Sequence, residues 1–467
     1  MKRIILYTTI LFSAILSSCD KYLDVNTNPN LVYNPSLNNL LVTTTYQTGI
    51  NVQRLGNVTS YYVQYLASPN PGSDRDTYQE EDLSVSWGAL YGAMMDTREM
   101  MRIAQQRGAT YHLGVAKVLL AMNLNMLINI FGDVPYSQAF QGRANVTPGY
   151  DNQQALHDTT IRLLNEAIAE FNGPAPTIIL DPGSDQIHQG NVDAWKKTAY
   201  TLKARFLNQL SETGEYNPAE ILTAVENGYD SNVDNAALTS FQTNSPWNQV
   251  ARNNAGLILD GWLSQQFVDA TNGATFGVMD PRLPLITNLT RFNDYRGTPN
   301  GVGRTGTGTN NEESVLTTTG FYSRAGAPLW LVTYAELKFI EAEAALRSND
   351  RSRAYTAYLE GIRAHMDMVG VASGARDAYL NNATVAVGAN NLTEALIFKE
   401  KYVAMFLHPE AWVDARRFDY QYEDFTLPAN AVLSSFVRRA AYPVVETSRN
   451  AANVPDVNML TSLWWDQ

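Results

Sequence analysis

Two carboxylates four residues apart could support hydrolytic chemistry. In the segment HPEAWVDARRFDY, Glu410 and Asp414 would share one face of a helix, with Cβ atoms about 6 Å apart. Glycosidases use two carboxyl groups about 5 to 9 Å apart. Arg416 and Arg417 follow within one turn, and positive neighbours favour ionised, paired acids over the raised pKa of an acid catalyst. We therefore predict a structural ion-pair site and no enzyme, and a surface glycosidase is the least favoured hypothesis.

The other residues that commonly carry chemistry are dispersed. The five histidines show neither HExxH nor i, i+4 spacing; they are His112, His157, His188, His365 and His408. This distribution predicts no zinc site. Gly301, Gly303 and Gly306 satisfy GxGxxG, but the motif lacks a preceding apolar strand and a following helix, so we expect a flexible loop rather than a dinucleotide site. We predict no catalytic residues, no metal and no cofactor.

The only cysteine, Cys19, stands where an apolar run ends. Lys2 and Arg3 precede residues 4–16, which are mostly apolar, as in a secretory signal. Thirteen helical residues span only about 20 Å, too short for a hydrocarbon core of about 30 Å. The residues LSSC at 16–19 resemble the lipobox of bacterial lipoproteins, which implies lipid on Cys19. We predict a signal peptide at 1–18 and a lipid anchor and tether at 19–40; the alternative is a free or buried thiol.

The composition narrows the choice of ligand. The formal net charge is −12, and such a surface repels phosphate backbones, so we predict no nucleic-acid partner. Neutral ligands are the more natural expectation. The chain contains 25 tyrosines and 8 tryptophans, side chains that can stack on sugar faces or peptides, although most aromatic residues belong to cores.

Helical patterns dominate the chain. Residues 113–131 are apolar on nearly every face, which predicts a buried helix. An apolar stripe from Trp195 follows an Asn191 cap. Thr333 and Glu336 form a capping box for a helix that ends at Arg347, and another helix is expected at 351–369. Asn391 with Glu394 would open one more. We predict an all-α fold of tetratricopeptide-type helical hairpins.

Long, weakly patterned stretches lie between these helices, at about 61–85, 231–260 and 270–330. Loops of this length in a compact protein are usually functional or disordered. We therefore expect the ligand-binding region in the loop-rich part at about 231–330, inserted into one domain at 41–467.

Several segments, taken in order, resemble one family: the SusD/RagB outer-membrane lipoproteins, in their SusD-like branch. They are CDKYLD at 19–24, WGALYGAMMDTREMM at 87–101, AKVLLAMNLNMLINIFGDVPYSQA at 116–139, AWKKTAYTLKARFLN at 194–208, MDPRLP at 279–284, AELKFIEAEAALR at 335–347, EAWVDARRFDY at 410–420 and RRAAYPVVETSRN at 438–450. Their spacing covers nearly the whole chain.

The resemblance implies tetratricopeptide-type helix pairs that support a loop-rich binding region, on a lipoprotein exposed at the surface of the outer membrane. It also implies a SusC-like TonB-dependent transporter as partner, oligosaccharide cargo and no catalysed reaction. Some branches take peptide instead. A peptide-binding or purely structural lid of such a transporter is therefore our alternative hypothesis.

The family's sugar-binding aromatics vary in position, so our candidate ligand residues rest on loop placement alone. They combine rings that can stack on sugars with groups that can bind hydroxyls. The candidates are Tyr78, Trp247, Tyr295, Phe321, Tyr322, Asn244, Asn248, Arg291 and Asn293. The alternative for each ring is that it fills a local core. Trp87 and Tyr91, by contrast, are expected to pack the first helical pair, and Trp412, Arg416 and Arg417 to anchor the C-terminal segment.

Overall fold

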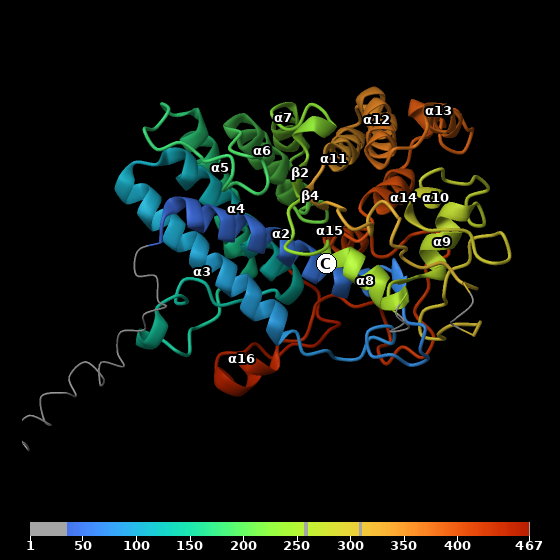
Figure 1. Ribbon diagram of the computed structural model, residues 1–467, viewed down its shortest axis with the longest axis horizontal. Helices are drawn as coiled ribbons and strands as arrows, with labels where there is room; N and C mark the ends of the chain where they lie inside the picture. The colour runs from blue at the N-terminus through green and yellow to red at the C-terminus, as the bar shows by residue number, and fades with distance from the viewer. Residues whose placement is uncertain (1–34, 256–259, 308–310, 467) are drawn as a thin grey trace, which may run out of the picture.

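The computed structural model describes residues 35–255, 260–307 and 311–466. Cys19, the predicted signal peptide and most of the predicted tether lie outside these residues. Helices that pack against one another form a scaffold (Figure 1). They are α2 (Leu37–Tyr62), α3 (Ser84–Arg107), α4 (Thr110–Phe131), α5 (Gln153–Asn172), α6 (Val192–Asn208), α7 (Pro218–Glu226), α11 (Tyr334–Arg347), α12 (Arg351–Val369), α14 (Glu394–Ala404) and α15 (Glu410–Arg417). The prediction of a mainly helical chain is confirmed.

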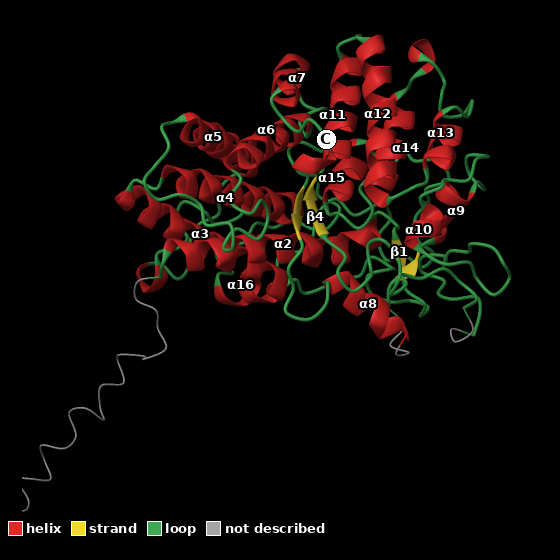
Figure 2. Ribbon diagram, turned by 45° about the horizontal axis from the view of Figure 1, so that its top comes forward, coloured by secondary structure: helices red, strands yellow, loops and turns green. Residues whose placement is uncertain are grey.

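The remaining elements are short and separated by long loops (Figure 2). The helical ones are η1 (Gly142–Ala144), η2 (Asn232–Asp234), α8 (Pro246–Ala255), α9 (Gln265–Asn272), α10 (Leu283–Ile286), α13 (Ser373–Leu380), η3 (Ala389–Asn391) and α16 (Val444–Arg449). The antiparallel strand pairs are β1 (Leu66–Ala67) with β3 (Trp262–Leu263), and β2 (Ala236–Leu238) with β4 (Leu329–Val332). The first pair joins the loop-rich region to the end of α2, because β1 follows that helix. The second pair joins it to the start of α11, because β4 precedes that helix.

Helix α4 is the centre of the first helical layers. Among the described residues it is the one helix long and apolar enough to cross a membrane, yet 89% of its apolar window is buried inside the protein. It is therefore a core helix, as its all-round hydrophobicity predicts. Trp87 packs edge-on against Phe131 at the end of α4, with ring centroids 4.9 Å apart, and contacts Tyr91 at 5.0 Å. The predicted packing role of Trp87 and Tyr91 is confirmed.

Buried ion pairs join helices that are distant in sequence. Arg282 of the MDPRLP segment is fully buried, and its guanidinium lies 2.5 Å from both the Asp280 and Glu400 carboxylates. Arg205 on α6 binds Glu336 on α11 through two N–H donors. Such pairs are costly to break because the remaining partner stays charged in a low-dielectric core.

The carboxylates of α15 behave differently from each other. Asp414 accepts hydrogen bonds from Lys401 Nζ at 2.9 Å and Arg417 Nη2 at 2.7 Å, so its predicted ion pairing is confirmed. The same prediction is wrong for Glu410, which forms no ion pair within the described ranges. Burial, reinforced by the nearby negative charges of Glu336 and Asp414 and opposed by Arg205, raises the pKa of Glu410 to about 7.

Trp412 and Arg416 anchor the C-terminal segment, as predicted. The Arg416 guanidinium stacks between the rings of Trp412 and Trp465, at 3.8 and 4.7 Å from their centroids. One of its nitrogens also donates to the carbonyls of Asn129 and Arg438, both at 2.8 Å. This single side chain therefore joins α15 to α4 and to Arg438 and Trp465 in the C-terminal segment.

Candidate functional site

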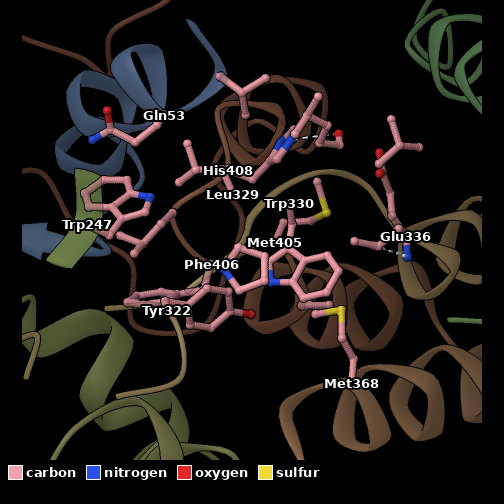
Figure 3. A pocket seen from close by; sticks show the side chains of 17 residues that line it. Gln53, Trp247, Tyr322, Leu329, Trp330, Glu336, Met368, Met405, Phe406 and His408 are labelled. Carbon is pink, nitrogen blue, oxygen red and sulfur yellow. Dashed lines mark hydrogen bonds between the residues drawn. The ribbon is translucent and has the colours of Figure 1, made fainter. Parts of the chain in front are cut away.

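Two of the predicted aromatic residues line one interior pocket, which we call the Trp247 pocket. Trp247 comes from α8, Tyr322 from the loop before β4 and Trp330 from β4, and Figure 3 shows them around a common space. The full lining is Val52, Gln53, Trp247, Tyr322, Pro328, Leu329, Trp330, Leu331, Val332, Thr333, Glu336, Met368, Ala404, Met405, Phe406, Leu407 and His408. Its chemistry is mainly aromatic and aliphatic.

The Trp247 pocket is small in this conformation. Its volume is about 40 Å³, room for only a few waters, since a cavity of about 10–15 Å³ holds one. Pockets for organic ligands are commonly about 300–1,000 Å³. Trp247 is 4% and Tyr322 6% exposed. The rings therefore pack chiefly against protein here, and a sugar would enter only after the surrounding loops move.

Fixed contacts hold the walls of the Trp247 pocket. The Tyr322 hydroxyl lies 2.9 Å from His365 Nε2, and Asn248 Nδ2 donates to the Ser323 carbonyl at 2.7 Å. Phe321 stacks parallel to Trp330, with centroids 6.2 Å apart. The indole N–H of Trp330 has no hydrogen-bond partner among the described residues, so the pocket retains one unused donor.

The other predicted residues lie elsewhere. Tyr78 is fully buried beneath Tyr62, and Asn244 is half-buried ahead of α8. Tyr295 is half-buried, whereas Asn293 is exposed on the same loop. Arg291 on that loop pairs with Glu312 at 2.5 Å. The structure thus groups Trp247, Asn248, Phe321 and Tyr322 and separates them from the remaining five.

A larger hollow with different chemistry opens in the loop-rich region, and we call it the polar pocket. Its volume is about 480 Å³, within the usual range for small-molecule sites. It is lined by Gln64, Gln265, Gln266, Asp269, Thr275, Pro299, Asn300, Val302, Asp424, Thr426, Leu427, Pro428 and Ala429. Four amides, two carboxylates and two threonines supply its polar groups, and two exposed aliphatic side chains, Val302 and Leu427, add apolar area.

Hydrogen bonds between distant segments fix the lining of the polar pocket. Gln64, at the end of α2, donates to the Thr426 carbonyl at 2.7 Å, and Gln266 on α9 donates to the Glu423 carbonyl at 2.9 Å. Gln265 donates to the Asp269 carboxylate at 3.1 Å. Each of these three glutamines thus donates one hydrogen bond to the protein. Their remaining amide groups make the pocket a multidentate hydrogen-bonding site.

Asn300 forms the buried part of the polar pocket. Its Nδ2 donates to Asp76 at 2.6 Å and to the Leu66 carbonyl at 3.0 Å, and its Oδ1 accepts from Ser264 at 2.5 Å. Asp76 also accepts the backbone N–H of Gly301 at 2.6 Å. Burial raises the Asp76 pKa to about 6, although these hydrogen bonds oppose the shift.

Gly301 contributes to the buried part of the polar pocket through its backbone. Its φ of 78° lies in the left-handed region, and a Cβ there would lie 1.8 Å from the Ala429 carbonyl oxygen. Only glycine permits this approach between the two loops. The GxGxxG stretch is therefore a loop that packs at Gly301 against the 424–430 segment, as the sequence predicted.

Two other hollows have less suitable linings. One, near α5 and α7, has a volume of about 590 Å³, and its Arg162 and Glu166 already pair with each other at 2.8 Å. The other, about 660 Å³ near α13, is bordered mainly by aliphatic side chains such as Val278, Met279 and Leu285. Hydroxyl-rich ligands need unoccupied polar partners, so the polar pocket suits them better.

The Glu410 region gives a substrate no access. The space beside Glu410 measures about 20 Å³, enough for a single water. Asp414 is committed to Lys401 and Arg417. Within the described ranges, no group of three histidine, cysteine or carboxylate side chains is placed to hold a metal.

Comparison with known proteins identifies the family. A family model described as starch-binding and associating with the outer membrane, SusD-like, matches residues 29–443. No curated protein matches the chain. The chain belongs to the SusD-like family, which is associated with the outer membrane. The sequence resemblance is confirmed.

Solved structures share the fold at low sequence identity. A chitin-binding SusD homologue from Flavobacterium johnsoniae is 20% identical, with a TM-score of 0.76 over 91% of this chain and 98% of that one. A SusD/RagB family protein from Bacteroides thetaiotaomicron is 22% identical, with a TM-score of 0.75 over 93% and 99%. A SusD homologue from Bacteroides fragilis is also 22% identical, with a TM-score of 0.76 over 93% and 100%. The predicted SusD-like fold is therefore confirmed.

Proposed function

We propose that this protein is a lipid-anchored outer-membrane receptor that captures oligosaccharides in the polar pocket and delivers them to a SusC-like TonB-dependent transporter. The observation that carries the proposal is the pocket of about 480 Å³ whose lining includes the side-chain amides of Gln64, Gln265 and Gln266. Side-chain amides offer both donors and acceptors, which matches the alternating hydroxyls of a glycan. No chemical step is required of the protein.

The similar proteins agree with carbohydrate as the cargo class. The family model is described as starch-binding, and one protein of similar fold is described as chitin-binding. Lipid on Cys19 would hold the pocket at the membrane beside its transporter. This requires several acyl chains on the cysteine, because one chain anchors a protein only marginally. Residues 1–18 would direct export and 19–40 would serve as the tether.

The first experiment is calorimetry on the protein purified in detergent, with a panel of starch-, chitin- and pectin-derived oligosaccharides. We expect saturable binding without cleavage. Gln265→Ala should weaken it about threefold to tenfold, the equivalent of one hydrogen bond. Gln249→Ala is the matched control, because Gln249 is also exposed and also bonds its own helix four residues on, to Asn253. Equal affinity of both variants would exclude the polar pocket.

The predicted aromatic cluster remains a second possible site. Its support is the unused N–H of Trp330 beside Trp247 and Tyr322. Because the polar pocket has no tryptophan in its lining, intrinsic fluorescence separates the two sites. A sugar-induced emission change that disappears in Trp247→Phe would assign the sugar to the Trp247 pocket.

Peptide cargo is the competing hypothesis, and it shares the same helical scaffold. Mass spectrometry of small molecules released from the protein, purified together with its transporter, distinguishes peptide cargo from sugar cargo. A bound peptide, together with silence across the sugar panel, would favour a peptide-binding or structural lid.

A further inference from the structure

The charges around the polar pocket restrict the sugars that it can accept. Asp269 and Asp424 line it, and none of the lining side chains is lysine or arginine. Asp269 accepts only neutral donors, Gln265 and Asn272. Asp424 is exposed and forms no hydrogen bond or ion pair with any described residue. Neither carboxylate is therefore neutralised by an ion pair with a described residue.

Groups just behind the lining do not compensate that charge. Asp76 supports the pocket from below through Asn300 and Gly301. The cation closest in sequence to the lining is Arg304, and its Nη1 faces the Pro69 carbonyl and Asn70 Oδ1, both at 3.4 Å. Arg296 is occupied by Asp294 at 2.6 Å. The lining thus contains two carboxylates and no cation, on a chain with a net charge of −12.

A pocket lined by carboxylates and no cations discriminates between sugars by the charge of their substituents. A protonated amine brings three N–H donors and a positive charge, and hydrogen bonds between ionised partners are roughly twice as strong as neutral ones. N-acetylation removes that charge. A uronate or sulfate would instead place like charges together, which costs affinity.

Resting on the proposed function, we infer that the polar pocket selects oligosaccharides that carry free amino groups, such as de-N-acetylated hexosamine chains. Asp424 and Asp269 bind the ammonium groups, and the amides of Gln64, Gln265 and Gln266 bind hydroxyls. Neutral N-acetylated chains bind more weakly, and acidic chains are rejected.

The test compares three oligosaccharides of equal length by calorimetry on the full protein in detergent: glucosamine, N-acetylglucosamine and galacturonate oligomers. At about pH 6, where an amine is charged, the glucosamine oligomer should bind about tenfold more tightly than its N-acetylated form. Raising the salt from about 0.02 M to about 0.5 M should narrow the difference, because screening weakens exposed charge pairs. The galacturonate oligomer should not bind.

Variants assign the preference to the two carboxylates. Asp424→Asn should bring the two affinities together, and asparagine tolerates the left-handed φ of 59° at this position. Asp269→Asn should act in the same direction. Asp193→Asn on α6 is the control, since it removes the same charge from an exposed position outside the pocket. The preference should survive in this control.

The outcomes are separable. Equal binding of the amino and N-acetylated oligomers, or binding of the galacturonate oligomer, would overturn the charge selection and leave the glycan receptor standing. So would a preference that persists in both Asp424→Asn and Asp269→Asn. Failure of every sugar in this set and in the wider panel would overturn the proposed function itself.

Discussion

At the scale of single residues, burial decides what a substitution at Trp247 reports. The side chain is 4% exposed and belongs to the main hydrophobic core. Large-to-alanine changes at such sites cost about 3–5 kcal/mol. We predict that Trp247→Ala lowers the free energy of unfolding in urea by about this amount. Phe292→Ala, at a ring that is 47% exposed, should cost less than about 1 kcal/mol. Equal costs would contradict the packing described here.

Glu410 gives a residue-scale prediction about pH. Its pKa in the folded protein is about 7, above the ordinary value of 4.5 for a glutamate. The folded state therefore holds a proton that the unfolded state has lost between about pH 4.5 and 7. Its contribution to stability is complete below that window and is lost as the pH rises through 7, by about 1.4 kcal/mol per pH unit.

Glu410→Gln isolates this titration because glutamine is neutral throughout. The stability difference between wild type and variant should shift against the wild type from pH 5 to 7 and become constant above about pH 8. Urea unfolding of both proteins across this range provides the measurement. A difference independent of pH would mean that Glu410 is ionised in the fold, as the sequence prediction held.

At the scale of elements, two helical glycines should respond to alanine with opposite sign. A Cβ on Gly56 of α2 would lie 2.3 Å from the Leu407 carbonyl oxygen, whereas one on Gly92 of α3 would meet nothing within 4 Å. Alanine is favoured over glycine in a helix by about 0.8–1 kcal/mol. Gly92→Ala should therefore stabilise the protein by up to that amount, while Gly56→Ala should destabilise it.

Thermal unfolding of the two variants checks this prediction. Both substitutions add one methyl group to a helix interior, so each serves as the control for the other. An increase in Tm for Gly56→Ala would show that α2 moves away from the Leu407 turn at little cost.

The ends of the helices were the most predictable features of the fold, because capping residues act on neighbouring backbone groups. The helix expected at 351–369 is α12, and Asn191 caps α6 as predicted. The capping box at Thr333 is half correct: Thr333 accepts from the Glu336 N–H, but the Glu336 carboxylate binds Arg205 instead of returning to the cap. The predicted Asn391 cap is wrong, since Thr393 caps α14. A tertiary contact overrides the local pattern at Glu336, whereas at α14 another local cap, Thr393, stands two residues after the predicted one.

At the scale of the whole molecule, the polar pocket was less predictable than the fold. Its α9 and Asn300 parts lie inside the predicted region at 231–330, but Gln64 and the 424–429 segment come from opposite ends of the chain. Glutamine and asparagine are common on surfaces, so no residue pattern marked them. The positive φ of Gln64 had no glycine to signal it. Loop aromatics were visible in the sequence, but whether each ring faces the core depends on packing.

Attachment to the membrane is the last whole-molecule prediction, and it follows from the single thiol at Cys19. One acyl chain gives only marginal binding, with a constant on the order of 10⁴ M⁻¹, whereas several chains anchor a protein stably. Cys19→Ala should therefore move the protein from the membrane pellet to the soluble fraction and abolish incorporation of a labelled fatty acid. Ser18→Ala keeps the thiol and should remain in the pellet. Retention of Cys19→Ala in washed membranes would show that protein contacts, such as those with a transporter, suffice without lipid.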